Sequence, residues 1–189
     1  MQYFIIHEGK FWNEILEVLK QKVKDGVDVR VFYDDMGCIV TLPNKYYEKL
    51  NKYGIKACSF NKFIPVLTAK LNNRDHRKIT IIDGKVAFTG GINLADEYIN
   101  EIERFGHWKD NGILIKGDAV WNFTVIFLSL WDYIHGKYEN LDYFKPKLEK
   151  INAKGFVQPY DDTPLDDERV GQTVCLNLLS YGSGYFKNA

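Results

Sequence analysis

The feature that most constrains the fold is an alternation of strand-like and helix-like segments over the first 60 residues. A short apolar run at residues 3–6 precedes a stretch, 11–24, in which apolar side chains recur at helical spacing. Residues 27–32, 44–53 and 55–60 then repeat the order strand, helix, strand. This alternation predicts an α/β fold in which helices connect parallel strands and cover the sheet that they form.

The next third of the chain adds strands of another kind. Residues 75–82 and 85–89 are both strand-like, and Asp83-Gly84 between them is a dipeptide that favours a tight two-residue turn. Residues 111–116 form a further expected strand, and residues 119–135 an apolar helix. The whole pattern predicts a mixed, largely parallel β-sheet flanked by helices.

Residues that commonly end helices stand at the expected helix boundaries. Gly26, Gly54 and Gly136 each follow one of the three expected helices, and glycine readily adopts the left-handed conformation that closes a helix. Asp118 precedes the third helix, where an aspartate side chain is a favourable N-cap.

Length and composition suit one domain plus part of a second. The chain has 189 residues, of which 46% are hydrophobic, so it contains enough apolar surface for a folded core. A charged connector begins near residue 138, followed by an expected strand at 155–160 and an expected helix at 170–180. We therefore expect a main domain over residues 1–155 and the start of a second half, truncated or divergent, over residues 156–189.

Cysteine use and hydropathy indicate the environment of the chain. Cys38, Cys58 and Cys175 are scattered without a CxxC pair, which favours a reducing compartment over a disulfide scaffold or a zinc site. The apolar start at residues 1–6 is too short for a signal peptide. The most apolar long stretch, 119–134, contains polar residues and is shorter than the roughly 20 residues of a bilayer span, so this chain is expected to be soluble.

One segment, 73–84, concentrates residues that suit phosphate chemistry. His76 and Lys78 are two apart on an expected strand, so both side chains point to the same face. A neutral imidazole beside an ammonium is a nucleophile beside a group that offsets phosphoryl charge. The alternative is an ordinary pair of side chains on a strand surface.

A second cluster follows the second strand of the expected hairpin. Gly90 and Gly91 allow backbone N–H groups to approach an anion closely, and Asn93 adds an amide donor. Asn93 has an alternative role as a cap of the following turn. The two clusters together predict a site that binds a phosphate.

His76, Lys78 and Asp83 have the His-x-Lys-x4-Asp spacing of the phospholipase D superfamily, which this chain closely resembles. Within that superfamily the chain is most similar to the first half of bacterial cardiolipin synthases, over residues 3–164. The similarity also rests on flanking blocks at residues 33–37, 73–79, 91–98, 108–110 and 117–120.

The resemblance implies a phosphatidyltransferase that moves a phosphatidyl group between phosphatidylglycerol-type lipids, with an anionic phospholipid as substrate and no metal or other cofactor. It implies that His76 attacks the phosphodiester to form a phosphohistidine, and that Asp110 orients the imidazole. Lys78, Gly91 and Asn93 are the implied phosphate-binding residues. The implied location is the cytoplasmic side of the cell membrane, with any membrane anchor elsewhere in a longer parent chain.

Several aspartates have structural alternatives. Asp83, the third member of the catalytic motif, is expected mainly to hold the hairpin turn, and Asp110 has the alternative of capping the strand that begins at Asn111. Asp34 and Asp35 invite comparison with metal ligands, but carboxylates at strand ends more often accept hydrogen bonds from loop amides.

The family mechanism needs two copies of the motif, and this chain carries one that lies on an expected strand. His7 and His107 are not followed by both a lysine and an aspartate at the motif's spacing. His135, Lys137 and Asp142 do have that spacing, but they stand at and beyond the end of an expected helix rather than on an expected strand. Either the chain is part of a protein about twice as long, or two copies pair as a homodimer so that each supplies one catalytic histidine.

Three functions stay open on this evidence: a half of a lipid phosphatidyltransferase, a homodimeric phosphodiesterase or nuclease of the same superfamily, and a non-catalytic phosphate-binding module. The 25 basic residues are balanced by 25 acidic ones and form no basic stripe, so nucleic acid is not the expected partner.

Two neighbouring features have two interpretations each. The apolar loop at residues 63–67, flanked by lysines, can enter a lipid interface or pack in the core. Arg74 and Arg77 can bind a second phosphate of an anionic lipid or pair with Asp75.

Overall fold

The computed structural model describes residues 1–62, 74–147, 157–162 and 169–181. Contacts divide the chain into two compact units, Met1–Ile151 and Asn152–Ala189. The apolar loop predicted at residues 63–67 lies outside the described residues.

The first unit is built on one six-stranded sheet. Its strands in chain order are β1 (Gln2–Tyr3), β2 (Arg30–Asp34), β3 (Lys56–Phe60), β4 (Ile79–Ile82), β5 (Val86–Gly90) and β6 (Gly112–Lys116). They lie in the spatial order β3-β2-β1-β4-β5-β6. The first three strands pair in parallel, whereas β4, β5 and β6 pair antiparallel with one another, and β4 pairs antiparallel with β1.

The predicted α/β class and mixed sheet are confirmed, but the sheet is parallel on one side only. Of the five neighbouring pairs of these strands, two are parallel and three antiparallel. The short Asp83-Gly84 turn accounts for the antiparallel β4–β5 pair, since it returns the chain beside β4 without a crossover helix. Both turn residues have positive φ, 52° for Asp83 and 63° for Gly84, as a tight hairpin turn of this kind requires.

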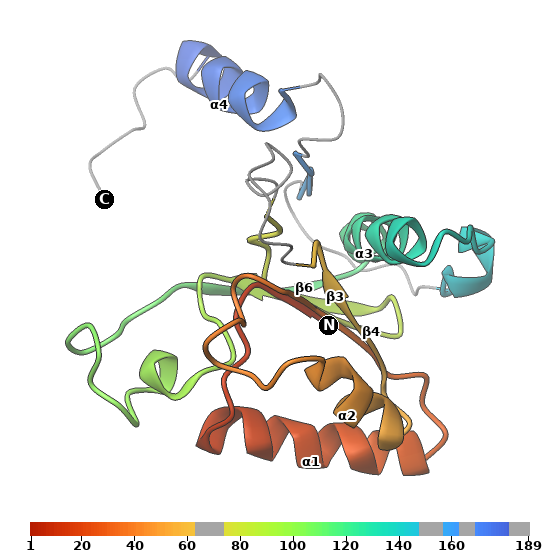
Figure 1. Ribbon diagram of the computed structural model, residues 1–189. Helices are drawn as coiled ribbons and strands as arrows, with labels where there is room; N and C mark the ends of the chain where they lie inside the picture. Colours follow the sequence, from red (N-terminus) through yellow and green to blue (C-terminus); the bar gives the residue numbers. More distant parts are fainter. Residues whose placement is uncertain (63–73, 148–156, 163–168, 182–189) are drawn as a thin grey trace. The chain divides into compact units, whose positions relative to one another are not determined.

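Helices cover both faces of the sheet. α1 (Lys10–Lys24) and α2 (Tyr46–Lys52) lie on one face, and α3 (Ala119–His135) lies on the other (Figure 1). A short 3-10 helix, η3 (Leu141–Phe144), follows α3. Within the described residues, no helix combines the length and the hydropathy that a bilayer span requires.

Adjacent residues of β2 belong to the cores on the two faces. Val31 is fully buried in a cluster that contains Trp12 of α1 and Leu50 of α2. Phe32, also fully buried, packs in a second cluster with Trp131 of α3. Because successive side chains of a strand point to opposite faces, the apolar residues of β2 contribute to the cores on both faces of the sheet. The buried central strand explains why the run shows little polar alternation.

The first turn of α1 is capped from a distant segment. Asp96, in the 3-10 helix η2 (Asp96–Ile99), accepts hydrogen bonds from the backbone N–H groups of Lys10 and Phe11 at 2.9 and 2.8 Å. A Cβ atom at Gly9 would come within 2.5 Å of this carboxylate, so glycine is needed for the approach. The cap therefore joins α1 to the segment that follows β5.

The predicted helix ends are confirmed with one exception. Gly26, Gly54 and Gly136 follow the three helices and have φ values of 85°, 80° and 62°. Asp118 stands at the N-cap position of α3 as expected, but its backbone is helical and its side chain makes no cap hydrogen bond. The strand expected at residues 3–6 is also shorter, since only β1 joins the sheet and Ile6 makes a separate bridge.

The described part of the second unit contains the helix α4 (Val170–Tyr181), which confirms the helix expected at 170–180. The Gly171 N–H donates a 3.1 Å hydrogen bond to the Asp162 carboxylate ahead of the helix. Residues 157–160, expected to complete a strand, belong to no strand, and residues 155 and 156 lie outside the described residues.

Candidate active site

Both predicted clusters lie at the end of the sheet where the parallel strands terminate. His76 and Lys78 precede β4, which runs antiparallel to β1, so they lie beside the residues that follow β1. The His76 ring stands 4.6 Å from the Phe4 ring. Gly91 and Asn93 follow β5 and reach the same end.

His76 and Lys78 are in direct contact. Lys78 Nζ lies 3.0 Å from His76 Nδ1 and 3.2 Å from His76 Nε2, and it donates a 2.7 Å hydrogen bond to the His76 carbonyl oxygen. Lys78 is buried, with 6% of its surface exposed, whereas His76 is exposed. The pair therefore offers an accessible imidazole beside a sequestered ammonium.

Burial and neighbouring charges set the protonation states of this pair. Desolvation lowers the pKa of His76 below its usual range, and the Lys78 ammonium lowers it further. Burial lowers the pKa of Lys78 to about 8, while the carboxylates of Asp75 and Asp110 act in the opposite direction. At neutral pH the imidazole is therefore uncharged and the lysine is charged, as a nucleophile and an anion-binding group require.

A buried polar network holds the backbone of the motif. The Asp75 carboxylate accepts hydrogen bonds from Gln2 Nε2 at 2.6 Å and from Arg77 Nε at 2.5 Å. The Asp75 N–H donates to Asp34 at 3.2 Å. Of the two roles considered for Arg77, the structure shows the ion pair with Asp75. Gln2 was not predicted, although a glutamine among apolar strand residues is a signal of a buried polar role.

Asp34, at the end of β2, is fully buried, and its carboxylate accepts hydrogen bonds from nearby groups. It accepts a 3.0 Å hydrogen bond from the Gly37 N–H, and Arg74 Nη1 lies 3.5 Å away. Burial raises the pKa of Asp34, while the Gly37 hydrogen bond and the Arg74 charge act to lower it. These contacts match the loop-amide interpretation. Among the described residues, no group of three or more His, Cys, Asp or Glu side chains could hold a metal ion.

Asp110 lies against Gly91. A Cβ atom at Gly91 would stand 2.5 Å from the Asp110 carboxylate, so glycine is required for this approach. The carboxylate accepts hydrogen bonds from Trp108 Nε1 at 3.1 Å and from the Asn111 N–H at 2.7 Å. Across the described residues it makes no hydrogen bond to His76, and its electrostatic effect is on Lys78. The structure therefore contains the capping contact at Asn111 that was the alternative for this residue.

Asn93 is buried and already partly engaged. Its Oδ1 accepts from the Ile5 N–H at 3.0 Å, and its Nδ2 donates to the Tyr98 hydroxyl at 2.9 Å. An amide nitrogen carries two hydrogens, so one donor position is left for an anion. The Tyr98 ring meets the Trp108 ring edge-on, with centroids 4.8 Å apart, which links Asn93 to the segment that carries Asp110.

Asp83 is not brought into this cluster. It is exposed in the turn after β4, whereas His76 precedes that strand. Seven extended residues span about 20 Å, so the carboxylate and the imidazole lie at opposite ends of β4. Its positive φ accounts for its place in the turn.

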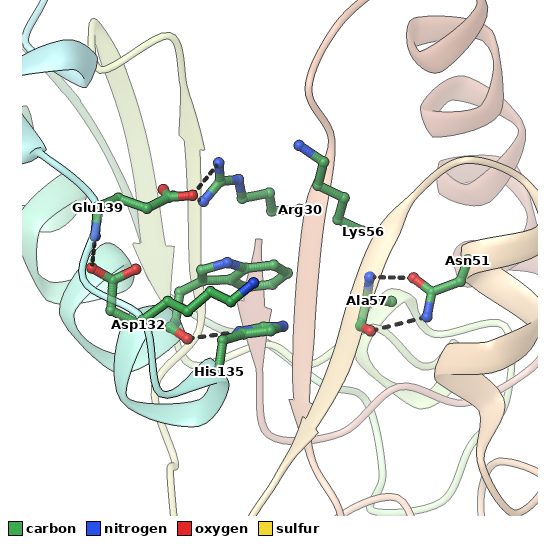
Figure 2. A pocket seen from close by; sticks show the side chains of 9 residues that line it. Arg30, Asn51, Lys56, Ala57, Asp132, His135 and Glu139 are labelled. Atoms are coloured by element: carbon green, nitrogen blue, oxygen red, sulfur yellow. Dashed lines mark hydrogen bonds and ion pairs between the residues drawn. The ribbon is translucent and has the colours of Figure 1, made fainter.

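A separate cavity of about 410 Å³ lies at the opposite end of the sheet, between the start of β2 and the end of α3 (Figure 2). Arg30 extends into it but pairs with Glu139 at 2.7 Å and with Asp28 at 3.0 Å, and Lys56 pairs with Asp28 at 2.9 Å. Its lining charges are thus largely compensated within the chain. The cavity has no contact with the His76 cluster.

Comparison with known proteins agrees with the motif. A family model described as "Cardiolipin synthase, PLD-like domain" matches residues 1–131. The chain is 49% identical over 185 residues to an uncharacterized protein of Streptococcus mutans, covering 98% of this chain and 40% of that protein. It is 38% identical over 182 residues to a cardiolipin synthase of Alkalihalophilus pseudofirmus, covering 95% of this chain and 36% of the relative. The chain belongs to the phospholipase D-like domain family of the cardiolipin synthases.

The chain spans well under half the length of these two relatives, 40% and 36%. This coverage agrees with the prediction that it corresponds to one half of a two-half protein. Among solved structures, it is similar to Nuc of Salmonella typhimurium, a phospholipase D family member, with a TM-score of 0.46 and 16% identity over 72% of this chain and 76% of that one.

Proposed function

We propose that this chain supplies the nucleophilic half-site of a phosphatidyltransferase that acts on phosphatidylglycerol-type lipids. The observation that carries the proposal is the exposed His76 ring with the buried Lys78 ammonium within 3.0 and 3.2 Å of its two nitrogens. An uncharged imidazole can attack phosphorus, and a fixed positive charge stabilises the phosphoryl oxygens as charge develops on them.

In the first step, an imidazole nitrogen of His76 forms a bond to phosphorus and the bond from phosphorus to the glycerol oxygen breaks. The departing alkoxide takes a proton from an imidazolium of a second motif. In the second step, the hydroxyl of another lipid gives its proton to that imidazole and its oxygen attacks phosphorus. The phosphorus–nitrogen bond breaks, His76 is restored, and cardiolipin is released.

The remaining predicted residues have supporting roles in this proposal. Asn93 Nδ2 and the backbone at Gly91 bind phosphoryl oxygens, beside the ammonium of Lys78. Asp110 counterbalances that ammonium from behind Gly91, and it orients His76 only if the imidazole turns toward it when substrate binds. Asp83 holds the turn.

The partner half supplies the second histidine. It comes either from the rest of a longer chain, whose second half begins within residues 156–189, or from a second copy of this chain. In both arrangements the two histidines face one phosphate from opposite sides, because the departing and attacking oxygens need a proton donor and acceptor that the nucleophile cannot provide.

A substrate whose leaving group departs without being protonated tests this half-site alone. A phosphatidyl ester of p-nitrophenol releases a stable phenolate, so the first step needs no proton from a partner half. We expect this chain to release p-nitrophenol in a burst and to carry afterwards a phosphatidyl group that is radiolabelled on phosphorus. The label should survive alkali and be lost in acid, as a phosphorus–nitrogen bond requires.

Matched variants and substrates decide between the candidate functions. His76→Ala should take up no label, whereas His135→Ala, at the opposite end of the sheet, should label like the parent chain. Undiminished labelling of His76→Ala contradicts the proposal. A p-nitrophenyl ester of a nucleotide that labels the chain better than the lipid ester supports the phosphodiesterase alternative, and no labelling by either ester supports a non-catalytic module.

A further inference from the structure

Two exposed apolar loops stand at the same end of the sheet as His76. The first runs from Asn100 to Trp108, where Ile102 and Phe105 are 50% and 60% exposed. The second follows β2, where Ile39 is 49% exposed and Val40 88% exposed. Exposing such side chains is unfavourable in water, by roughly 25 cal/mol for each Å² of apolar surface.

The first loop is closed at its neck rather than loose. The Asn100 side chain donates to the Trp108 carbonyl at 2.9 Å and accepts from the Trp108 N–H at 2.6 Å. Trp108 in turn contacts Tyr98 and donates to Asp110. The neck of the loop is therefore connected to predicted residues of the candidate site. The tip with Ile102 and Phe105 is therefore held at a set position relative to the site.

The second loop is tied to the first through the segment after β1. Thr41 Oγ1 donates to the Ile6 carbonyl at 2.7 Å, and the Ile6 N–H lies 3.2 Å from Cys38 Sγ. On its other side this segment pairs with Leu94, through the His7 N–H to the Leu94 carbonyl at 2.9 Å. The two loops therefore flank one short segment, and His76 packs on Phe4 just before it.

Two of the charged residues of the first loop are compensated inside the chain, whereas Glu103 is exposed and makes no ion pair with the described residues. Glu101 pairs with Lys10, and Arg104 pairs with Glu97 at 3.0 Å. The Arg104 guanidinium also lies 5.0 Å from the centroid of the Phe105 ring. The large apolar side chains that stay exposed in this loop are Ile102 and Phe105.

We infer that these two docking loops, residues 36–40 and 100–108, enter the acyl region of a lipid bilayer and hold the His76 site at the depth of the headgroup phosphates. The inference rests on the proposed function for its choice of partner, since the substrate would be a lipid held in that bilayer. Two separate loops with exposed apolar side chains suit a fluid surface, which adapts to both, whereas a protein partner would need a matching contact for each loop. Attachment by burial of apolar side chains predicts little dependence on salt.

Vesicle binding by the full chain tests this inference without any turnover. Vesicles of phosphatidylcholine with phosphatidylglycerol should carry the chain into the pellet on sedimentation, at low and at high salt alike. The variant with Ile102→Ser and Phe105→Ser together should partition about thirtyfold less, and Val40→Ser about fivefold less. Tyr138→Ser is the matched control, because Tyr138 is 90% exposed and follows α3 at the far end of the sheet.

A second readout locates the contact. In Phe105→Trp, vesicles with brominated acyl chains should quench the added tryptophan fluorescence, and in Tyr138→Trp they should quench little of it. The inference is overturned if the chain stays in the supernatant, if Tyr138→Ser weakens binding as much as the docking variants do, or if binding disappears at high salt. It is also overturned if the docking variants bind vesicles normally but lose self-association, which would assign the loops to a second copy of the chain. Failure of the His76 labelling would leave the vesicle result unaffected, so the two proposals fail separately.

Discussion

Replacing Lys78 with methionine should make the protein more stable while removing its phosphate-binding charge. The pKa of Lys78 falls from an ordinary value of 10.5 to about 8, chiefly through burial. At neutral pH this fall corresponds to about 3 kcal/mol by which the folded state disfavours the charged lysine. Methionine has a similar length and no charge, so it removes that cost.

Part of the gain is offset by a lost hydrogen bond. Lys78 Nζ donates to the His76 carbonyl, and leaving that acceptor without its partner costs about 1 kcal/mol. The net expected gain for Lys78→Met is therefore about 2 kcal/mol in the free energy of unfolding at pH 7. Urea unfolding followed by circular dichroism measures it. Lys116→Met, at an exposed position of β6, is the control and should change stability by less than about 0.5 kcal/mol.

The pH dependence gives this prediction its sign. The cost of the charge is fully present below the folded pKa of about 8, and it fades as pH rises toward the unfolded value of 10.5. The advantage of Lys78→Met should therefore be largest at neutral pH and vanish near pH 10.5. A variant that is less stable than the parent chain at pH 7, or an advantage that persists at high pH, would refute the argument that burial opposes this charge.

Four further outcomes are expected. Gly91→Ala places a methyl group within 2.5 Å of the Asp110 carboxylate, so the rate of His76 labelling should fall at least about tenfold with circular dichroism unchanged. Asp96→Ala removes both hydrogen bonds to the first turn of α1 and should lower the free energy of unfolding by about 1–2 kcal/mol in urea titrations. Asp83→Asn should label at the parent rate, because asparagine also tolerates positive φ; a tenfold loss would return this residue to the site. The labelling rate should also decline as pH rises through about 8, where Lys78 loses its proton, and a flat profile to pH 10 contradicts that assignment.

Much of the site was predictable because its central pair is local. His76 and Lys78 are two residues apart, and their side chains are in contact, although the strand expected from residue 75 begins only at Ile79. The turn at Asp83-Gly84 was equally predictable, since both positions need a positive φ that these residues tolerate. Their spacing also identified the family, which the matching model over residues 1–131 confirms.

Other parts of the site could not be read from spacing. The contact of Gly91 with Asp110 joins residues 19 positions apart through a looped segment, so no local rule sets it. Asp83 belongs to the motif by spacing, yet it follows β4 whereas His76 precedes it. The two side chains therefore lie at opposite ends of that strand. Gln2 supports Asp75 across 73 positions, a pairing that depends on which strand lies beside β4.

By itself, the order of residues determined the helices, the hairpin, the reactive pair and most of the strands, though not all of their bounds, because each depends on backbone preferences within a few positions. Only the tertiary structure decided that the sheet is parallel on one side and antiparallel on the other. It also decided that Lys78 is buried beside an exposed His76, and that two apolar loops flank them. Those outcomes depend on which surfaces exclude water from one another, a property of the packed chain rather than of any one segment.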